Sequence, residues 1–211
     1  MKITKLGHCC LLIEIDSVKI LTDPGNYSTA QDTVTNINFV LITHEHTDHL
    51  HIESVKKIVT NNPDVVIITN SAVSKLLTKE NITHKIVEHN QETDMSGVAL
   101  KGWGTKHAEI YKTLEYVLNT GYIIANRLFY PGDAFTKLEQ NIEILALPVA
   151  GPWMKLSEAI DYALTVKPKK CFPVHDGNLR TPGVSHRLPT QELTKAGIEF
   201  TPLTEGQSIT F

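Results

Sequence analysis

Short apolar runs separated by polar turns make up most of this chain, and such a pattern is typical of β-strands. Residues 10–15 and 18–21 flank Asp16 and Ser17, which predicts a β-hairpin near the N-terminus. Other runs of the same kind predict strands at 39–42, 65–68, 82–87, 98–103, 114–118, 121–125, 128–130, 142–149 and 171–174.

Apolar residues at helical spacing predict a smaller number of helices, which cover residues 48–59, 71–79, 157–167 and 190–196. Residues 176–189 contain two glycines and two prolines and are therefore expected to form a loop. Several strands precede each helix, so we expect mixed sheets with the helices packed outside them, an α/β (α+β) fold. The length of 211 residues fits one domain, residues 1–211.

Composition narrows the class of protein further. Hydrophobic residues make up 41% of the chain and charged residues 20%, as in ordinary globular proteins. The net charge of −3 gives no overall attraction for nucleic acid, which is not an expected partner. Three cysteines without regular spacing, no signal-peptide pattern and no long apolar run indicate a cytoplasmic protein that does not enter a membrane.

The strongest chemical signal is a histidine cluster that directly follows the expected strand 39–42. The segment His44-Glu45-His46-Thr47-Asp48-His49 places four potential metal ligands within six residues. Side chains on a turn between a strand and a helix can converge on one small volume. Histidine nitrogen and carboxylate oxygen together suit zinc, manganese or iron. Clustered imidazoles otherwise repel one another and lose hydration, so a metal site explains the cluster better than folding does.

This His-x-His-x-Asp-His segment resembles the signature of the metallo-β-lactamase superfamily. Four other motifs match in the expected order along residues 1 to 180: Ile20–Pro24, Thr105–His107, Phe129–Asp133 and Pro173–His175. Residues 6–8 and 147–151 resemble the branch that includes the L-ascorbate-6-phosphate lactonase, although Asp176 stands where that branch often has an aromatic residue.

The resemblance implies a four-layer αββα sandwich and two divalent metal ions, with zinc the first expectation and manganese or iron as alternatives. It assigns the metal ligands residue by residue: His44, His46 and His107 to one ion, Asp48, His49 and His175 to the other, and Asp133 to both. A hydroxide between the ions would then be the nucleophile, because metals acidify bound water, and Asp48 and Asp133 would be the catalytic carboxylates.

A metal-dependent hydrolase of a small ester, lactone or phosphoester is therefore the expected function. A phosphodiesterase or nuclease of the same fold and a non-catalytic metal-binding module are the alternatives. The expected partner is a small, anionic substrate, and a homo-oligomer is left open. The metal site is expected to lie on loops at one edge of the sheets, where catalytic groups usually gather.

Several residues outside the ligand set are candidates for supporting roles. Asp23 is expected to hydrogen-bond a ligand histidine, and its alternative role is that of a turn residue before Pro24. His8 either points to the site or is structural. The candidates for contact with an anionic substrate are His8, Arg180, His186 and Arg187, the last three on the 176–189 loop. The three cysteines are expected to be small core residues.

Overall fold

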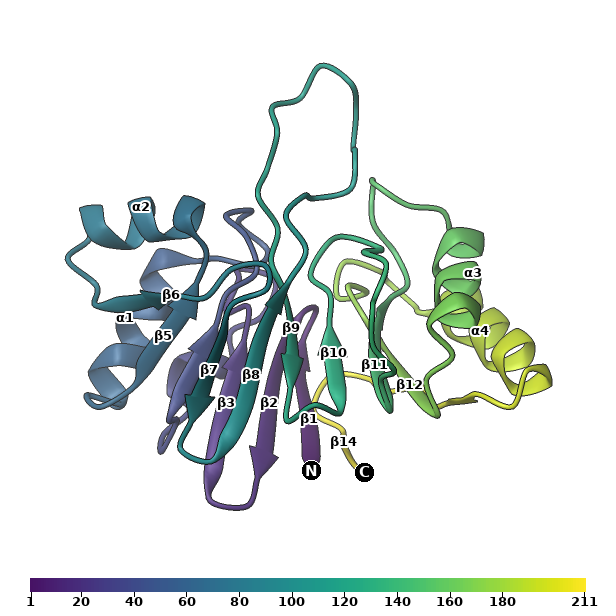
Figure 1. Ribbon diagram of the computed structural model, residues 1–211, viewed down its shortest axis with the longest axis horizontal. Coiled ribbons are helices and arrows are strands. Elements are labelled where there is room, and N and C mark those ends of the chain that lie inside the picture. Colours follow the sequence, from purple (N-terminus) through teal and green to yellow (C-terminus); the bar gives the residue numbers. More distant parts are fainter.

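Two seven-stranded sheets face each other, and two helices cover the outer side of each sheet (Figure 1). The computed structural model describes residues 1–211. The first sheet has the order β14-β1-β2-β3-β4-β5-β6, built from Ser208–Thr210, Lys2–Gly7, Cys10–Ile15, Val18–Thr22, Phe39–Leu41, Val66–Thr69 and His84–Ile86. The second has the order β13-β12-β11-β10-β9-β8-β7, built from Glu199–Phe200, Lys170–Val174, Ile144–Pro148, Leu128–Tyr130, Gly121–Ile124, Val98–Trp103 and Glu92–Met95.

Each sheet contains both parallel and antiparallel pairs. Strands β14, β1, β2 and β3 pair antiparallel, whereas β3, β4, β5 and β6 pair parallel. The second sheet repeats this division, because β7 to β10 are antiparallel and β10 to β13 are parallel. The expected four-layer αββα sandwich with mixed sheets is therefore confirmed.

The helices pack on the sheets through apolar faces. Helices α1 (Ile52–Asn61) and α2 (Ser71–Lys79) bury residues such as Val55 and Leu77 against the first sheet. Helices α3 (Leu156–Val166) and α4 (Gly183–Lys195) do the same on the second sheet, and a short 3-10 helix spans Ala30–Thr33. None of the helices has both the length and the apolar character that crossing a bilayer requires.

The largest apolar cluster lies between the two sheets. It contains 22 buried residues contributed by strands of both sheets, among them Ile13, Tyr122 and Phe172. Strands near the centre of a sheet are covered on both sides, which explains why β11 is buried at every position. This packing holds the two sheets rigidly against each other and fixes the loops at their shared edge.

Helix α1 begins later than the periodicity indicated. The expected range was 48–59, but the helix spans Ile52–Asn61. The backbone amides of His49 and Leu50 both donate to the carbonyl of His46, at 2.9 and 2.8 Å, which makes tight turns in place of a first helical turn. The histidine segment is therefore an irregular connection between β4 and α1.

Two other predictions were wrong. Residues 114–118 form no strand, since they lie on a projecting connection between β8 and β9, where Leu114 and Tyr116 are exposed and no strand pairs with them (Figure 1). The 176–189 segment is only partly a loop, because α4 begins at Gly183 and continues through Pro189. Burial of Leu193 on its inner face stabilises this helix despite unfavourable local residues.

Candidate metal centre

The residues expected to bind metal come together at one edge of the sandwich, each on a connection that follows a strand. His44 to His49 follow β4, His107 follows β8, Asp133 follows β10 and His175 follows β12. Strands β8, β10 and β12 run in the same direction, so their C-terminal ends meet at this edge. A hydrogen bond of 3.2 Å from the amide of His175 to the carbonyl of His8 joins the two sheets there.

The first group contains His44, His46, His107 and Asp133, whose ligand atoms all lie within 4.8 Å of one another. Nε2 of His107 is 3.4 Å from Oδ2 of Asp133, and Nε2 of His44 is 4.0 Å from the same oxygen. Nε2 of His44 is also only 3.1 Å from Nδ1 of His46. Three imidazoles and one carboxylate therefore point at one small space.

A second group lies on the other side of Asp133. Its Oδ1 is 3.1 Å from Nε2 of His49, and its Oδ2 is 2.9 Å from Nε2 of His175. Oδ2 of Asp48 faces the same two nitrogens, at 3.8 Å from that of His49 and 3.6 Å from that of His175. The carboxylate of Asp133 thus stands between the two groups and reaches both.

Outer hydrogen bonds fix which nitrogen of each ring faces the centre. Nδ1 of His49 lies 2.7 Å from Oδ2 of Asp23, and a carboxylate can only accept, so the ring donates from Nδ1. The hydroxyl of Thr43 donates to Asp23 at 2.7 Å and so accepts from Nδ1 of His44 at 3.0 Å. Nδ1 of His107 donates to the carbonyl of Ala108 at 2.5 Å. In all three rings the Nε2 lone pair is left for a metal.

Unsatisfied buried atoms support the assignment of a cation site. Buried polar atoms are almost always hydrogen-bonded in native proteins. Here Nε2 of His49, Nε2 of His107, Oδ1 of Asp133 and both ring nitrogens of His175 are buried without a hydrogen-bond partner. A cation at the centre would satisfy these lone pairs, and nitrogen and carboxylate donors suit zinc, manganese or iron. The residues present therefore fit a metal centre.

The pKa values of the proposed ligands are consistent with a metal centre. Burial raises the pKa of Asp133, but the electrostatic influence of His49 and His175 outweighs burial and holds it well below its usual value. Burial and the charge of His49 hold the pKa of His44 well below its usual value. Burial would lower the pKa of His49, yet the charge of Asp133 raises it. Asp133 is thus an anion that draws positive charge to this position.

Two cavities open beside the centre. One of about 440 Å³ borders His46 and His107 and is otherwise walled by the β8–β9 loop, residues 104–120. The other, of about 360 Å³, is lined by Asp48, Asp133, Trp153 and further residues around the ligands. Trp153 is 7% exposed and borders this second cavity. Small molecules can therefore reach both groups of ligands.

The proposed substrate contacts are not brought together at the centre. His186 is buried in α4, and its Nε2 lies 2.6 Å from Oδ2 of Asp176, so the expectation that it contacts substrate needs correction. Arg180 and Arg187 are exposed and line neither cavity. His8 is buried, and its Nε2 lies 3.2 Å from Oδ2 of Asp48, which places it behind a ligand rather than facing a substrate.

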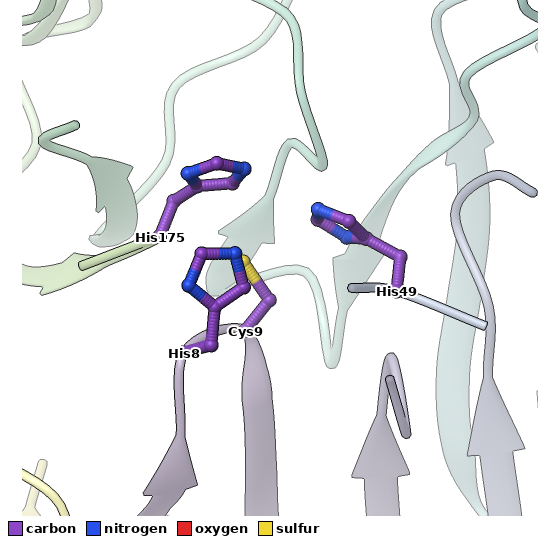
Figure 2. Close-up of side chains that lie close together, drawn as sticks. All are labelled: His8, Cys9, His49 and His175. Carbon is purple, nitrogen blue, oxygen red and sulfur yellow. The ribbon is translucent and has the colours of Figure 1, made fainter. Parts of the chain in front are cut away.

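Several residues at the centre were missed from the sequence. Cys9 lies in the core between the sheets, as expected, but the sequence did not indicate that its sulfur lies beside His49 and His175 (Figure 2). The hydroxyl of Tyr130 lies 2.7 Å from Oδ2 of Asp23, and Thr43 bonds the same carboxylate. The only sequence feature that could have indicated a role for Cys9 at the centre was its position next to His8, at a turn between two strands.

Comparisons with known sequences agree with this geometry. A family model described as a β-lactamase superfamily domain matches residues 2–175. The chain is 29% identical over 218 residues to the Mycobacterium tuberculosis protein Rv0786c, with 100% of each chain covered. It is 30% identical over 186 residues to a UPF0173 protein of Pyrococcus abyssi, with 84% of each chain covered.

Solved structures share the fold. A crystal structure of a Parabacteroides distasonis protein has a TM-score of 0.79 at 24% identity, covering 97% of this chain and 93% of that one. Igni18, described as a metallo hydrolase from Ignicoccus hospitalis, has a TM-score of 0.78 at 19% identity, covering 100% and 97%. The chain belongs to the metallo-β-lactamase superfamily and, within it, to the UPF0173 family of metal-dependent hydrolases.

Proposed function

We propose that this metal-dependent hydrolase uses two divalent cations to cleave a small anionic ester, lactone or phosphoester, as in a lactonase. The observation that carries the proposal is the position of Asp133 between two groups of ligands. Its Oδ2 faces His107 at 3.4 Å, and its Oδ1 faces His49 at 3.1 Å. The proposed holders of the cations are His44, His46 and His107 on one side, Asp48, His49 and His175 on the other, and Asp133 for both.

Cations bound there would supply a water ionised near neutral pH and a positive charge that polarises the substrate oxygen. The chain's own residues position the cations and the attacking water. Asp133 fixes the spacing of the two groups, because one carboxylate reaches both. Asp48, whose side chain is 20% exposed, borders the 360 Å³ cavity and can accept a hydrogen bond from an attacking water. Nε2 of His8 holds this carboxylate in place at 3.2 Å.

The larger cavity indicates which part of a substrate lies where. Ile110, Tyr111, Leu114 and Tyr116 of the β8–β9 loop line it, and each of them is at least 36% exposed. Exposed apolar side chains gathered beside a catalytic cavity are typical of a ligand-binding wall. Lys106 and Lys112 line the same cavity together with Glu109 and Glu115, so its charged side chains balance. The apolar contacts favour a substrate with an apolar or aromatic group of moderate size, and we place its anionic group beside the cations.

Zinc is the first metal to test, with manganese and iron(II) as alternatives, because imidazole-rich sites accept all three. The test measures bound metal per chain and then hydrolysis of lactones, phosphodiesters and thioesters by the loaded protein. We expect about two metal equivalents and turnover of a small anionic substrate. His46→Ala should lower turnover more than about 100-fold, since it removes a proposed ligand rather than an outer partner.

His84→Ala is the matched control, because His84 lies on β6, where it bonds Ser74 and a backbone carbonyl rather than the ligands. Full turnover by His46→Ala would contradict the proposal. Binding of no metal would favour a non-catalytic module instead. Activity on RNA that falls steeply with salt would favour a nuclease, because phosphate contacts release counterions.

A further inference from the structure

The sulfur of Cys9 belongs to a second cluster of potential metal ligands, although Cys9 itself lines neither cavity. Cys9 lies at the turn between β1 and β2 and is 1% exposed. Its Sγ and ring nitrogens of His8, His49 and His175 all lie within 4.8 Å of one another (Figure 2). These residues come from three separate parts of the chain, so the cluster is not a product of local sequence.

Side-chain hydroxyls from both sheets hold the turn that contains Cys9. The hydroxyl of Thr22 on β3 donates to the carbonyl of Cys9 at 2.8 Å, and the hydroxyl oxygen of Tyr130 on β10, which donates to Asp23, lies 2.8 Å from the same carbonyl. The preceding residue, His8, has a φ of 43°, a conformation that a side-chain-bearing residue adopts only when its surroundings fix it. The position of the sulfur is therefore set by contacts from two sheets.

Unpartnered nitrogens face the same space and provide an independent observation. The side chain of His175 is 3% exposed, its Nδ1 has no partner, and its Nε2 faces Oδ2 of Asp133 at 2.9 Å without a well-directed hydrogen bond. Nε2 of His49 is likewise buried without a partner, and its other nitrogen is bonded to Asp23. Two lone-pair donors beside a buried thiol form the kind of donor set that binds zinc.

His8 is not a ligand, although its ring lies in the cluster. The amide N–H of Gly177 points at Nδ1 of His8 at 3.1 Å, so this nitrogen must accept. The neutral ring then carries its proton on Nε2 and donates it to Asp48 at 3.2 Å. Neither nitrogen has a lone pair left for a cation.

We propose that Cys9 is a thiolate ligand of the cation held by His49 and His175. On binding, the S–H bond breaks, the sulfur keeps the electron pair and bonds the metal, and the proton leaves to solvent. Cys9 would join Asp48, Asp133 and the two histidines as a further ligand. Zinc bonds of about 2.0–2.3 Å hold neighbouring ligand atoms about 3–4 Å apart, so the present cluster needs only a small contraction. The soft sulfur would make this site prefer zinc over manganese.

The test uses the full chain loaded with cobalt(II), which reports thiolate ligands through a charge-transfer band in the near ultraviolet. The wild-type protein should show this band, and Cys9→Ser should lose it while keeping its fold by circular dichroism. Cys10→Ser is the matched control, since Cys10 is equally buried and also packs among apolar side chains, but it is not part of the group of donors. It should keep the band.

A second measurement needs no variant. X-ray absorption of the zinc-loaded wild-type protein should show a sulfur scatterer at about 2.3 Å. The inference rests on the proposed metal centre but not on its reaction, and the outcomes separate the two. Two bound cobalt ions without the band, or a band that survives in Cys9→Ser, would overturn the role of Cys9 alone. Failure to bind cobalt at all would overturn both proposals.

Discussion

Replacement of Asp23 by asparagine tests whether the hydrogen bonds of this carboxylate orient a metal-binding histidine. Asp23 is completely buried, and four donors converge on it, each at 2.7 Å. Oδ1 accepts from the amide of Thr43, and Oδ2 accepts from the Thr43 hydroxyl, His49 and Tyr130. Asparagine has nearly the same shape, but its amide group is a donor where the carboxylate oxygen was an acceptor. At least one of the four donors must then lose its partner.

Two effects of Asp23→Asn can be given magnitudes. Loss of the carboxylate partner of a ligand histidine lowers metal affinity about 10–100-fold, or about 1.4–2.7 kcal/mol. A buried donor left without an acceptor costs about 1–3 kcal/mol of stability. For a chain of this length, that loss lowers the melting temperature by about 2–12 °C.

The assay is a competition titration of zinc between the protein and a chromophoric chelator, with thermal unfolding followed in parallel. Tyr130→Phe is the control, because it removes one donor and leaves the carboxylate with three. We expect its zinc affinity to fall by less than about tenfold, below the range for loss of the carboxylate. Zinc affinity unchanged in Asp23→Asn would refute the conclusion that this carboxylate orients His49.

Three further outcomes are expected. Asp176→Asn leaves Lys5 buried and unpaired, so unfolding at pH 7 should be easier by about 3–5 kcal/mol. Burial raises the pKa of Asp176, but the hydrogen bond from His186 and the charge of Lys5 outweigh burial and lower the pKa. The stability difference between Asp176→Asn and the wild type should therefore shrink as pH falls below about 4, where the carboxylate becomes protonated. A stability difference that persists in acid would contradict this role of Asp176. Chelation of metal present at 100 times its dissociation constant should remove about 2.7 kcal/mol per site, measured as a lower melting temperature, whereas no shift would contradict metal binding. Leu114→Ala should raise KM about tenfold with metal content unchanged, and an unchanged KM would exclude the β8–β9 loop from substrate binding.

The sequence was most informative where chemistry and local order coincide. All seven side chains of the proposed centre lie close to the ends of apolar runs, and strand ends gather at one edge of a sandwich. The turn at His44–His49 brings several donors together within six residues. Such short-range patterns are visible without any knowledge of how distant segments pack.

The missed features depend on packing between distant segments. Lys5 and Asp176 are 171 positions apart, yet they form a buried ion pair that includes His186 on α4. Glycine and proline near the start of α4 predicted a loop, whereas contacts with the second sheet stabilise a helix there. Cys9 resembles any small core residue until the fold brings His49 and His175 beside it.

Strand β14 has a consequence for synthesis of the protein. It pairs with β1, so residues 208–210 complete a sheet that residues 2–7 begin. At about 5–20 residues per second, the ribosome takes about 10–40 seconds to add the intervening chain. During that time the β1 edge of the nascent sheet has unpaired amides and carbonyls, to which a strand of another chain can pair.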